Sequence, residues 1–195
     1  MSNWRDKFEN FEITTSWEKY KNPNKPRLKL NEYRLVKINF KLYLEVKTQK
    51  LEITFLTDLK YFNLIQNHTW YCSKSQKDNT YYVKTNIKNK NILFHKIIYP
   101  NYKIIDHILR NGLDNRNINL RETTYNQNGL NCKLSKNNTS GYNGISKYGI
   151  YWLFQWFENK KHKVKYFKTK QLAIEFKLKH DKITGNQNGY PVNYI

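Results

Sequence analysis

The chain contains little cysteine, few acidic residues and no long apolar run. Cys72 and Cys132, its two cysteines, stand 60 positions apart, and no Cys-x-x-Cys motif occurs in the 195 residues. Two isolated thiols argue against a disulfide framework or a structural zinc site, so we expect both to be reduced and the fold to depend on packing. No apolar run approaches the roughly 18 residues of a membrane span, and the N-terminus lacks the apolar segment of a signal peptide. These absences predict an intracellular protein without a membrane-spanning segment.

Basic residues outnumber acidic ones to an unusual degree. Lysine and arginine total 35 against 15 aspartate and glutamate, which gives a formal charge of +20 and an isoelectric point of about 9.8. An excess this large predicts a polyanionic partner, bound through counterion release. No segment shows the dense apolar face of a membrane-surface helix, so nucleic acid is favoured over an anionic membrane.

Hydrophobic periodicity predicts an α+β fold with a β-rich N-terminal region. We interpret residues 1–30 as a loosely ordered arm with a short helix near Trp4–Phe11. Apolar and polar residues then alternate from Tyr33 to Phe55, as in half-buried strands. Further elements are expected in this order: a helix at Thr57–Ile65 with Thr57 as its N-cap, a hairpin formed by Trp70–Cys72 and Tyr81–Thr85, and a helix at Ile92–Tyr99 stopped by Pro100.

After Leu130 the chain changes character. Residues 133–140 form a polar connector, which we interpret as a linker. Beyond it we expect three strands followed by a helix, at Tyr142–Ser146, Tyr151–Phe157, His162–Phe167 and Lys170–His180. Their alternation favours a core position for Trp152 and Phe154. A three-stranded sheet packed on one helix is therefore predicted for residues 141–195.

The most informative segment runs from Ile105 to Asn128. Asp106 and His107 precede a turn-rich loop, and Asn119 and Asn128 follow 12 and 21 positions after His107. Imidazole suits a general base because its pKa lies near neutrality. Asp106 and His107 are neighbours, and neighbours on a strand point to opposite faces, so the pair needs a twist or bulge to serve one catalytic centre. One carboxylate and one neutral carbonyl fit Mg²⁺ or Mn²⁺ better than zinc. In so basic a protein, this set predicts metal-assisted phosphodiester hydrolysis.

This segment resembles the HNH endonucleases, whose core of two strands and a helix surrounds one metal ion (the ββα-metal fold), and especially the HNN subset of phage and viral homing-type enzymes. The resemblance covers Phe94–Asn131 and rests on Phe94-His95-Lys96, Ile105–Ile108, Leu113–Arg116, Asn119–Arg121 and Gln127-Asn128. It implies that Asp106 and Asn128 bind one Mg²⁺ or Mn²⁺, that His107 is the general base, and that Asn119 braces the loop between the strands. The accessory residues would be His95, Lys96, Arg116 and Arg121. Lys96 stands where such enzymes have arginine, which keeps the charge but loses bidentate contact with phosphate.

Residues 141–195 resemble a second family, the ethylene-response-factor-type DNA-binding domain (the APETALA-two fold). The matching segments are Ser140–Ser146, Trp152–Phe154, Tyr166-Phe167 and Ala173–Phe176. The resemblance implies that the sheet lies in the DNA major groove and that lysine and aromatic residues of its exposed face make the contacts. The lysines expected to bind DNA are Lys147, Lys161, Lys163, Lys165 and Lys168. Lysine mostly contacts phosphate, so we expect modest sequence discrimination.

These features predict a homing-type DNA endonuclease of a viral or phage mobile element, acting in the cytoplasm or nucleoid of a host cell. It would cut double-stranded DNA as a monomer or a DNA-induced dimer. The expected regions are an N-terminal arm with the first strand (1–40), a β-rich module (41–91), the nuclease core (92–132), the linker (133–140) and the DNA-binding domain (141–195). Two alternatives stay open: a sequence-preferring DNA-binding protein with an inactive core, and a nuclease directed at RNA, which basic aromatic sheets also bind.

Overall fold

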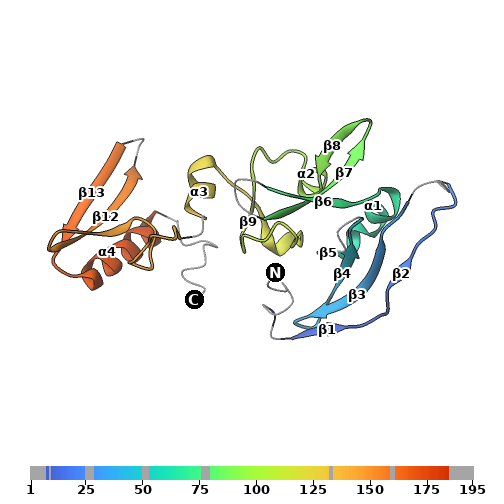
Figure 1. The fold of residues 1–195 in the computed structure, drawn as a ribbon, viewed down its shortest axis with the longest axis horizontal. Coiled ribbons are helices and arrows are strands. Elements are labelled where there is room, and N and C mark those ends of the chain that lie inside the picture. Colours follow the sequence, from blue (N-terminus) through green and yellow to red (C-terminus); the bar gives the residue numbers. More distant parts are fainter. Residues whose placement is uncertain are drawn as a thin grey trace. The chain divides into compact units, whose positions relative to one another are not determined.

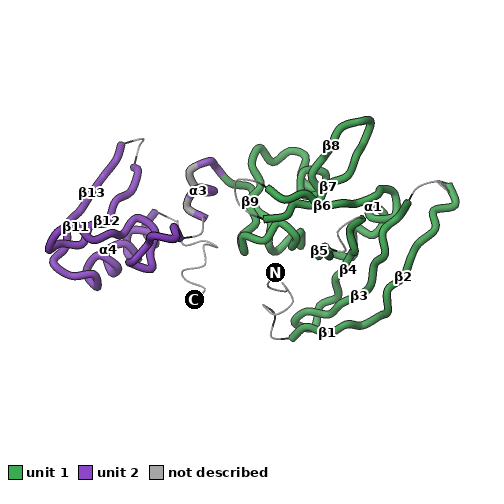
Figure 2. The backbone as a smooth tube through the Cα atoms, in the orientation of Figure 1, with its two compact units in different colours: residues 1–123 green, residues 124–195 purple. Residues whose placement is uncertain are grey.

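The chain forms two compact units in an α+β fold that is rich in strands, as the periodicity predicts (Figure 1). The computed structural model describes residues 8, 10–24, 29–49, 53–75, 80–131, 134–158 and 161–184. Unit 1 comprises residues 1–123 and unit 2 residues 124–195 (Figure 2). Within the described ranges, no helix is long and apolar enough to cross a membrane.

An antiparallel sheet at the start of unit 1 has the order β1-β3-β4-β5, and β2 pairs with the other end of β3. Its strands are β1 (Phe11–Ile13), β2 (Glu18–Lys19), β3 (Glu32–Ile38), β4 (Lys41–Lys47) and β5 (Thr54–Asp58). The central strand β4 is covered on both faces: Leu44 and Val46 belong to a core with Trp70, whereas Tyr43 packs with Val36. The strand-like alternation expected from Tyr33 to Phe55 is confirmed in β3, in β4 and at the start of β5, and residues 50–52 lie outside the described residues.

Three expectations for this region are wrong. The arm is not loosely ordered throughout, because β1 and β2 both pair with β3. Of the helix expected near Trp4–Phe11, Phe11 instead begins β1, and most of the remainder lies outside the described residues. Thr57 does not cap a helix: it is buried in β5 opposite Leu44. Thr57 pairs with Leu44 in the sheet and is therefore not a helix cap, and helical structure begins two residues later, at Leu59.

The helical segment after β5 leads into a second antiparallel sheet. A 3-10 turn (Leu59–Tyr61) and α1 (Phe62–Asn67) are followed by β6 (Tyr71–Lys74), β7 (Tyr81–Ile87), β8 (Lys90–Leu93) and α2 (Phe94–Ile98). The expected hairpin is confirmed in β6 and β7. The predicted helix at Ile92–Tyr99 is shorter, because Ile92 belongs to β8 and pairs with Thr85. Phe94 is fully buried against Phe55 and Trp70, so it joins the two sheets in one core.

The motif segment supplies the last strands of unit 1 and the first helix of unit 2. β9 (Ile105–His107) and β10 (Leu120–Glu122) form an antiparallel pair, and α3 is Tyr125–Leu130. Residues 108–119 join the strands and are called the connecting loop below. The predicted strand at Asn119–Arg121 is confirmed with a shift of one residue.

Unit 2 contains the predicted three-stranded sheet and helix, although the first strand, expected at Tyr142–Ser146, begins only at Ile145. The strands are β11 (Ile145–Tyr148), β12 (Tyr151–Glu158) and β13 (Lys161–Phe167), and α4 spans Lys170–Ile183 (Figure 1). Ile145, Phe154 and Ala173 form the buried centre, and Trp152 packs against them, so the expected core positions are confirmed. The hydroxyl of Thr169 caps α4 by accepting a hydrogen bond from the Leu172 amide.

Candidate active site

Asp106 and His107 are neighbours on β9 and are both buried, with 6% of each residue exposed. The register pairs Asp106 with Arg121 and His107 with Leu120. The three pairs follow one another without a bulge in this described stretch. Successive strand residues point to opposite faces, so Asp106 shares a face with Arg121 and His107 shares the other with Leu120. The register therefore does not supply the bulge that the sequence argument required.

Asn119 holds the connecting loop in its bent shape. Its fully buried side chain accepts a hydrogen bond from the Leu109 amide through Oδ1 and donates one to the Asp114 carbonyl through Nδ2, both at 2.7 Å. Its carbonyl oxygen accepts a third from the Ile108 amide at 2.8 Å. All three partners lie in the loop that follows His107, so Asn119 determines how the chain leaves β9.

The connecting loop also docks on the first sheet of unit 1. Leu56 of β5 donates its amide hydrogen to the Leu113 carbonyl and accepts one from Asn115, each at 2.8 Å. Asp114 and Arg116 form a buried two-pronged ion pair, with Nε–Oδ1 2.8 Å and Nη2–Oδ2 2.7 Å. The Arg116 charge thus stabilises the loop from within.

Asn115 orients the His107 ring. Its Nδ2 donates to the Gly112 carbonyl at 3.2 Å, so Oδ1 is the atom 3.3 Å from His107 Nε2. An oxygen accepts hydrogen, so this assignment places the proton on Nε2 and leaves Nδ1 as the basic nitrogen. Burial lowers the pKa of His107, against the opposing effects of the Asn115 hydrogen bond and the Asp114 and Asp106 carboxylates. A neutral imidazole of fixed tautomer is what a general base requires.

His95 and Tyr82 pack against the ring of His107. The centroid of His95 lies 5.0 Å from that of His107 with the planes nearly perpendicular, and that of Tyr82 lies 5.7 Å away. Burial, assisted by His107 and Lys96, lowers the pKa of His95 to about 3, so His95 is neutral at physiological pH. The structure therefore brings the predicted accessory His95 to the predicted base.

The cationic accessory residues are bound within the fold. Lys96 Nζ donates to the backbone carbonyls of Tyr102 and Lys103 at 2.9 and 2.8 Å and holds the turn after α2. Arg121 donates from Nε and Nη2 to Oδ2 of Asp106 at 3.0 and 2.6 Å. The predicted metal ligand Asp106 thus has a guanidinium partner across the strand pair.

The donor chemistry predicted for a metal suits a hard cation, although its two residues lie in different units. Asp106 offers a buried carboxylate in unit 1, and Asn128 is an exposed residue of α3 in unit 2. Carboxylate and amide oxygens fit Mg²⁺ or Mn²⁺. Such a cation would have to share the Asp106 carboxylate with Arg121 or displace it. The described residues contain no group of three or more His, Cys, Asp or Glu side chains that could hold a metal ion.

The predicted DNA-binding lysines of unit 2 lie on an unexpected side of the sheet. Register pairs Lys147 with Trp152, Lys163 with Trp156 and Lys165 with Phe154, and these aromatic partners face α4. Lys161 follows the same alternation, and Lys165 lies 4.1 Å above the Phe176 ring of α4. Lys168 is exposed in the bend after β13. The opposite face of the sheet carries aromatic residues in place of these lysines.

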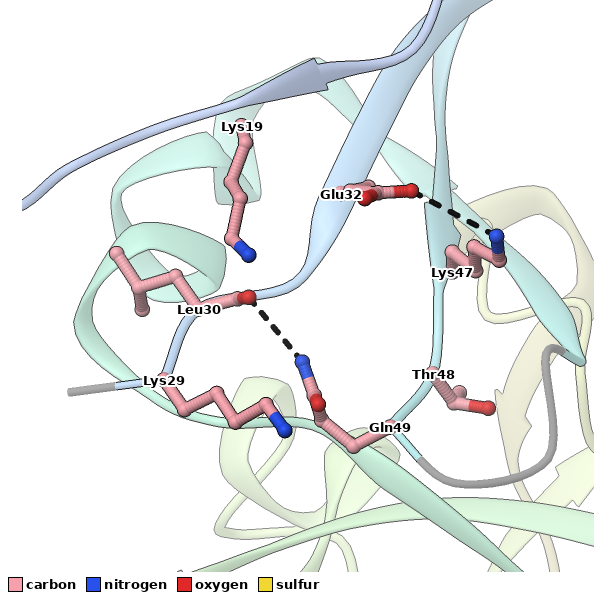
Figure 3. Close-up of a pocket in the computed structure, with 7 residues that line it drawn as sticks. All are labelled: Lys19, Lys29, Leu30, Glu32, Lys47, Thr48 and Gln49. Atoms are coloured by element: carbon pink, nitrogen blue, oxygen red, sulfur yellow. Dashed lines mark hydrogen bonds and ion pairs between the residues drawn. The ribbon is translucent and has the colours of Figure 1, made fainter.

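A separate basic pocket opens in unit 1 where β3 begins and β4 ends. It encloses about 340 Å³ and is lined by Lys19, Lys29 and Lys47 together with Glu32 and Gln49, among others (Figure 3). Lys47 Nζ lies 3.6 Å from Glu32 Oε2, and Gln49 donates to the Leu30 carbonyl at 3.1 Å. Three lysines against one glutamate make the lining net positive. None of the predicted catalytic residues lines this pocket.

Sequence reasoning missed Asn115, Tyr82 and the role of the Asp114–Arg116 pair. The Leu-Asp-Asn-Arg run marks the loop, but only the folded loop shows which of its side chains turns toward His107. Tyr82 lies about 25 positions earlier, on β7, and no local pattern links it to the motif.

Comparison of the chain with protein-family models, with curated proteins and with solved structures finds no match to any of them. The resemblances to HNH and ethylene-response-factor-type domains therefore rest on the quoted residues alone.

Proposed function

We propose that the chain is a metal-dependent DNA endonuclease that hydrolyses phosphodiester bonds, with His107 as its general base. The observation that carries the proposal is the buried, neutral imidazole of His107, held in one tautomer by Asn115, on a residue that directly follows Asp106 in β9. Asn119, at the position that the resemblance assigns to the loop brace, makes two side-chain hydrogen bonds to the backbone of the connecting loop. The formal charge of +20 suits a phosphodiester substrate.

In this reaction Nδ1 of His107 takes a proton from a water molecule, and the water oxygen attacks phosphorus. The bond from phosphorus to the 3′ oxygen breaks, and that oxygen takes up a proton from solvent, which leaves a 5′ phosphate and a 3′ hydroxyl. Mg²⁺ or Mn²⁺ on Asp106 and Asn128 would supply positive charge beside the phosphate when bound. Asn115 keeps the proton on Nε2, so that the lone pair of the neutral ring lies on Nδ1.

The decisive experiment compares the wild type with His107→Ala on supercoiled plasmid in the presence of Mg²⁺ or Mn²⁺. We expect the wild type to relax the plasmid and the variant to bind it without cutting. His107→Gln, which fills more of the buried site, serves as a second inactive variant, and circular dichroism establishes that both are folded. Equal relaxation by all three proteins would contradict the proposal.

A second candidate, a DNA-binding protein with an inactive core, is favoured by two observations. Arg121 pairs with Asp106, and the strand register places Asp106 and His107 on opposite faces. The same plasmid assay separates the candidates, because an inactive core yields binding without relaxation in the wild type. Competition between duplex DNA and RNA of equal length tests the third candidate, a nuclease directed at RNA.

A further inference from the structure

The sheet of unit 2 has one face that α4 does not cover, and this outer face follows from the strand register. Side chains alternate along each strand, and paired residues share a face. Because Ile145, Phe154 and Trp152 pack on α4, the residues between them point away from it. The outer face consists of Ser146, Tyr148, Tyr151, Leu153, Gln155, Phe157, His162, Val164 and Tyr166.

The outer face is aromatic and carries no lysine, arginine or carboxylate in the described strands. Phe157 is 74% exposed, Tyr148 64% and Tyr166 55%, and Tyr151 is exposed as well. Tyr148 and Tyr166 lie with ring centroids 6.0 Å apart, across β12 from one another. These rings therefore present flat apolar surfaces to whatever binds, whereas most exposed sheet faces are polar.

Positive charge surrounds this face without entering it. Residues 124–195 contain twelve lysines, no arginine and three carboxylates. On the edge strand β13, Lys161, Lys163 and Lys165 alternate with outer-face residues, and Lys161 and Lys163 are exposed. Lys168 and Lys170 follow directly after that strand. An aromatic surface without lysine, arginine or carboxylate, with a cationic border, is complementary to bases whose π faces are free and whose phosphates lie at the edge.

We propose that the outer face binds single-stranded DNA by stacking unpaired bases on Tyr148, Phe157 and Tyr166. Duplex DNA fits this surface less well, because its base faces are hidden in the stack and its accessible backbone needs cations that this face lacks. The choice of DNA over RNA rests on the proposed function; the stacking itself does not. In a nuclease, such a surface would hold a locally opened strand.

The test measures fluorescence anisotropy of the full chain in EDTA, which suppresses cleavage, so the result is independent of catalysis. The probes are a mixed-sequence single strand of about 16 nucleotides, the duplex of the same sequence, and an abasic strand of equal length. We expect the single strand to bind more tightly than either of the others. Phe157→Ala and Tyr166→Ala should each weaken single-strand binding about 5- to 150-fold and leave duplex binding nearly unchanged.

Two control variants separate stacking from charge. Phe40→Ala removes an aromatic side chain that is 86% exposed in unit 1, and it should leave all three affinities unchanged. Lys163→Gln should weaken binding of all three probes alike and reduce the salt dependence of binding. Because Phe157 and Tyr166 are surface residues, their variants should keep the wild-type circular dichroism spectrum.

Four results would overturn the proposal. The first is unchanged single-strand affinity in both Phe157→Ala and Tyr166→Ala. The second is abasic or duplex binding as tight as that of the single strand. The third is at least tenfold tighter binding of the matching single-stranded RNA, which would refute the choice of DNA. The fourth is a concentration-dependent dimer in sedimentation that Phe157→Ala dissociates, which would make the face a contact between copies of the chain.

Discussion

Replacing Asn119 with alanine should destabilise unit 1 selectively, because one side chain satisfies two backbone groups of the connecting loop. The Leu109 amide and the Asp114 carbonyl would both lose a 2.7 Å hydrogen bond. A buried polar group left without a partner costs about 1–3 kcal/mol. Asp114 is buried and Leu109 is half-buried. Water can therefore replace the hydrogen bond to the Leu109 amide more readily than the one to the Asp114 carbonyl. We therefore expect a loss of about 2–5 kcal/mol in the free energy of unfolding of unit 1.

Two measurements together check this magnitude and its location. Urea denaturation followed by circular dichroism gives the change in unfolding free energy, and hydrogen exchange with mass spectrometry shows where protection is lost. Amides of β9, β10 and the connecting loop should exchange faster, whereas those of β11 to β13 should not change. A loss of this size is a large part of the roughly 5–15 kcal/mol that stabilises a typical domain.

Asn101→Ala is the matched control, because Asn101 is an exposed asparagine in the turn after α2. It should change stability by less than about 0.5 kcal/mol. The reasoning would be refuted if Asn119→Ala cost no more than this control, or if it reduced protection equally in both units. In either case the two short hydrogen bonds of Asn119 would not determine the shape of the loop.

Two further predictions concern the surroundings of His107. Gly112→Ala should lower the free energy of unfolding by about 1–3 kcal/mol through overpacking, because its Cβ would lie 2.3 Å from the Tyr81 carbonyl and 2.7 Å from the Tyr82 ring. Thermal denaturation measures this loss. The control Gly129→Ala, whose Cβ would meet nothing within 4 Å, should not lower stability in the same assay. For His95, the pKa of about 3 in the folded state lies below the ordinary 6.5, so the folded state binds fewer protons. The contribution of neutral His95 to the free energy of unfolding is complete above pH 6.5 and is lost as the pH falls towards 3. The loss is about 1 kcal/mol between pH 6.5 and 5.5. His95→Gln should flatten this decline of stability with pH in denaturation curves. An unchanged slope in His95→Gln would contradict the burial of a neutral ring.

The fold of unit 2 could be predicted almost completely because its signals are local. The alternation along β12 and β13 lies within the strands that it defines. Unit 1 depends more on distant pairing. β1 and β2 are short strands that exist because β3 offers them hydrogen-bonding partners, and nothing in their own sequence marks them. Thr57 has the composition of a helix cap, but pairing with Leu44 outweighs that preference.

The candidate site likewise has a part that could be predicted from local sequence and a part that depends on distant pairing. The motif identifies Asp106, His107 and Asn119 by type and spacing, yet their partners depend on the register of two short strands and on a loop that docks against β5. Arg121 faces Asp106 only because the loop has the length that sets this register. A loop one residue longer or shorter would shift the register of β9 and β10, and Asp106 and Arg121 would then no longer share a face.

The lysines of β13 show how much a period of two can establish without a fold. The run from Lys161 to Tyr166 separates lysine from non-lysine positions on its own, so the two sets must occupy opposite faces of a strand. Which set α4 covers is decided elsewhere, by Phe154 and Trp156, which pair with Lys165 and Lys163 and bring them to the helix side. Pattern alone favours burying His162, Val164 and Tyr166 and exposing the lysines. Pairing with β12 has the opposite result and places the lysines on the side of α4. The outer face, expected to bind phosphate through lysine, instead carries aromatic rings suited to stacking on bases.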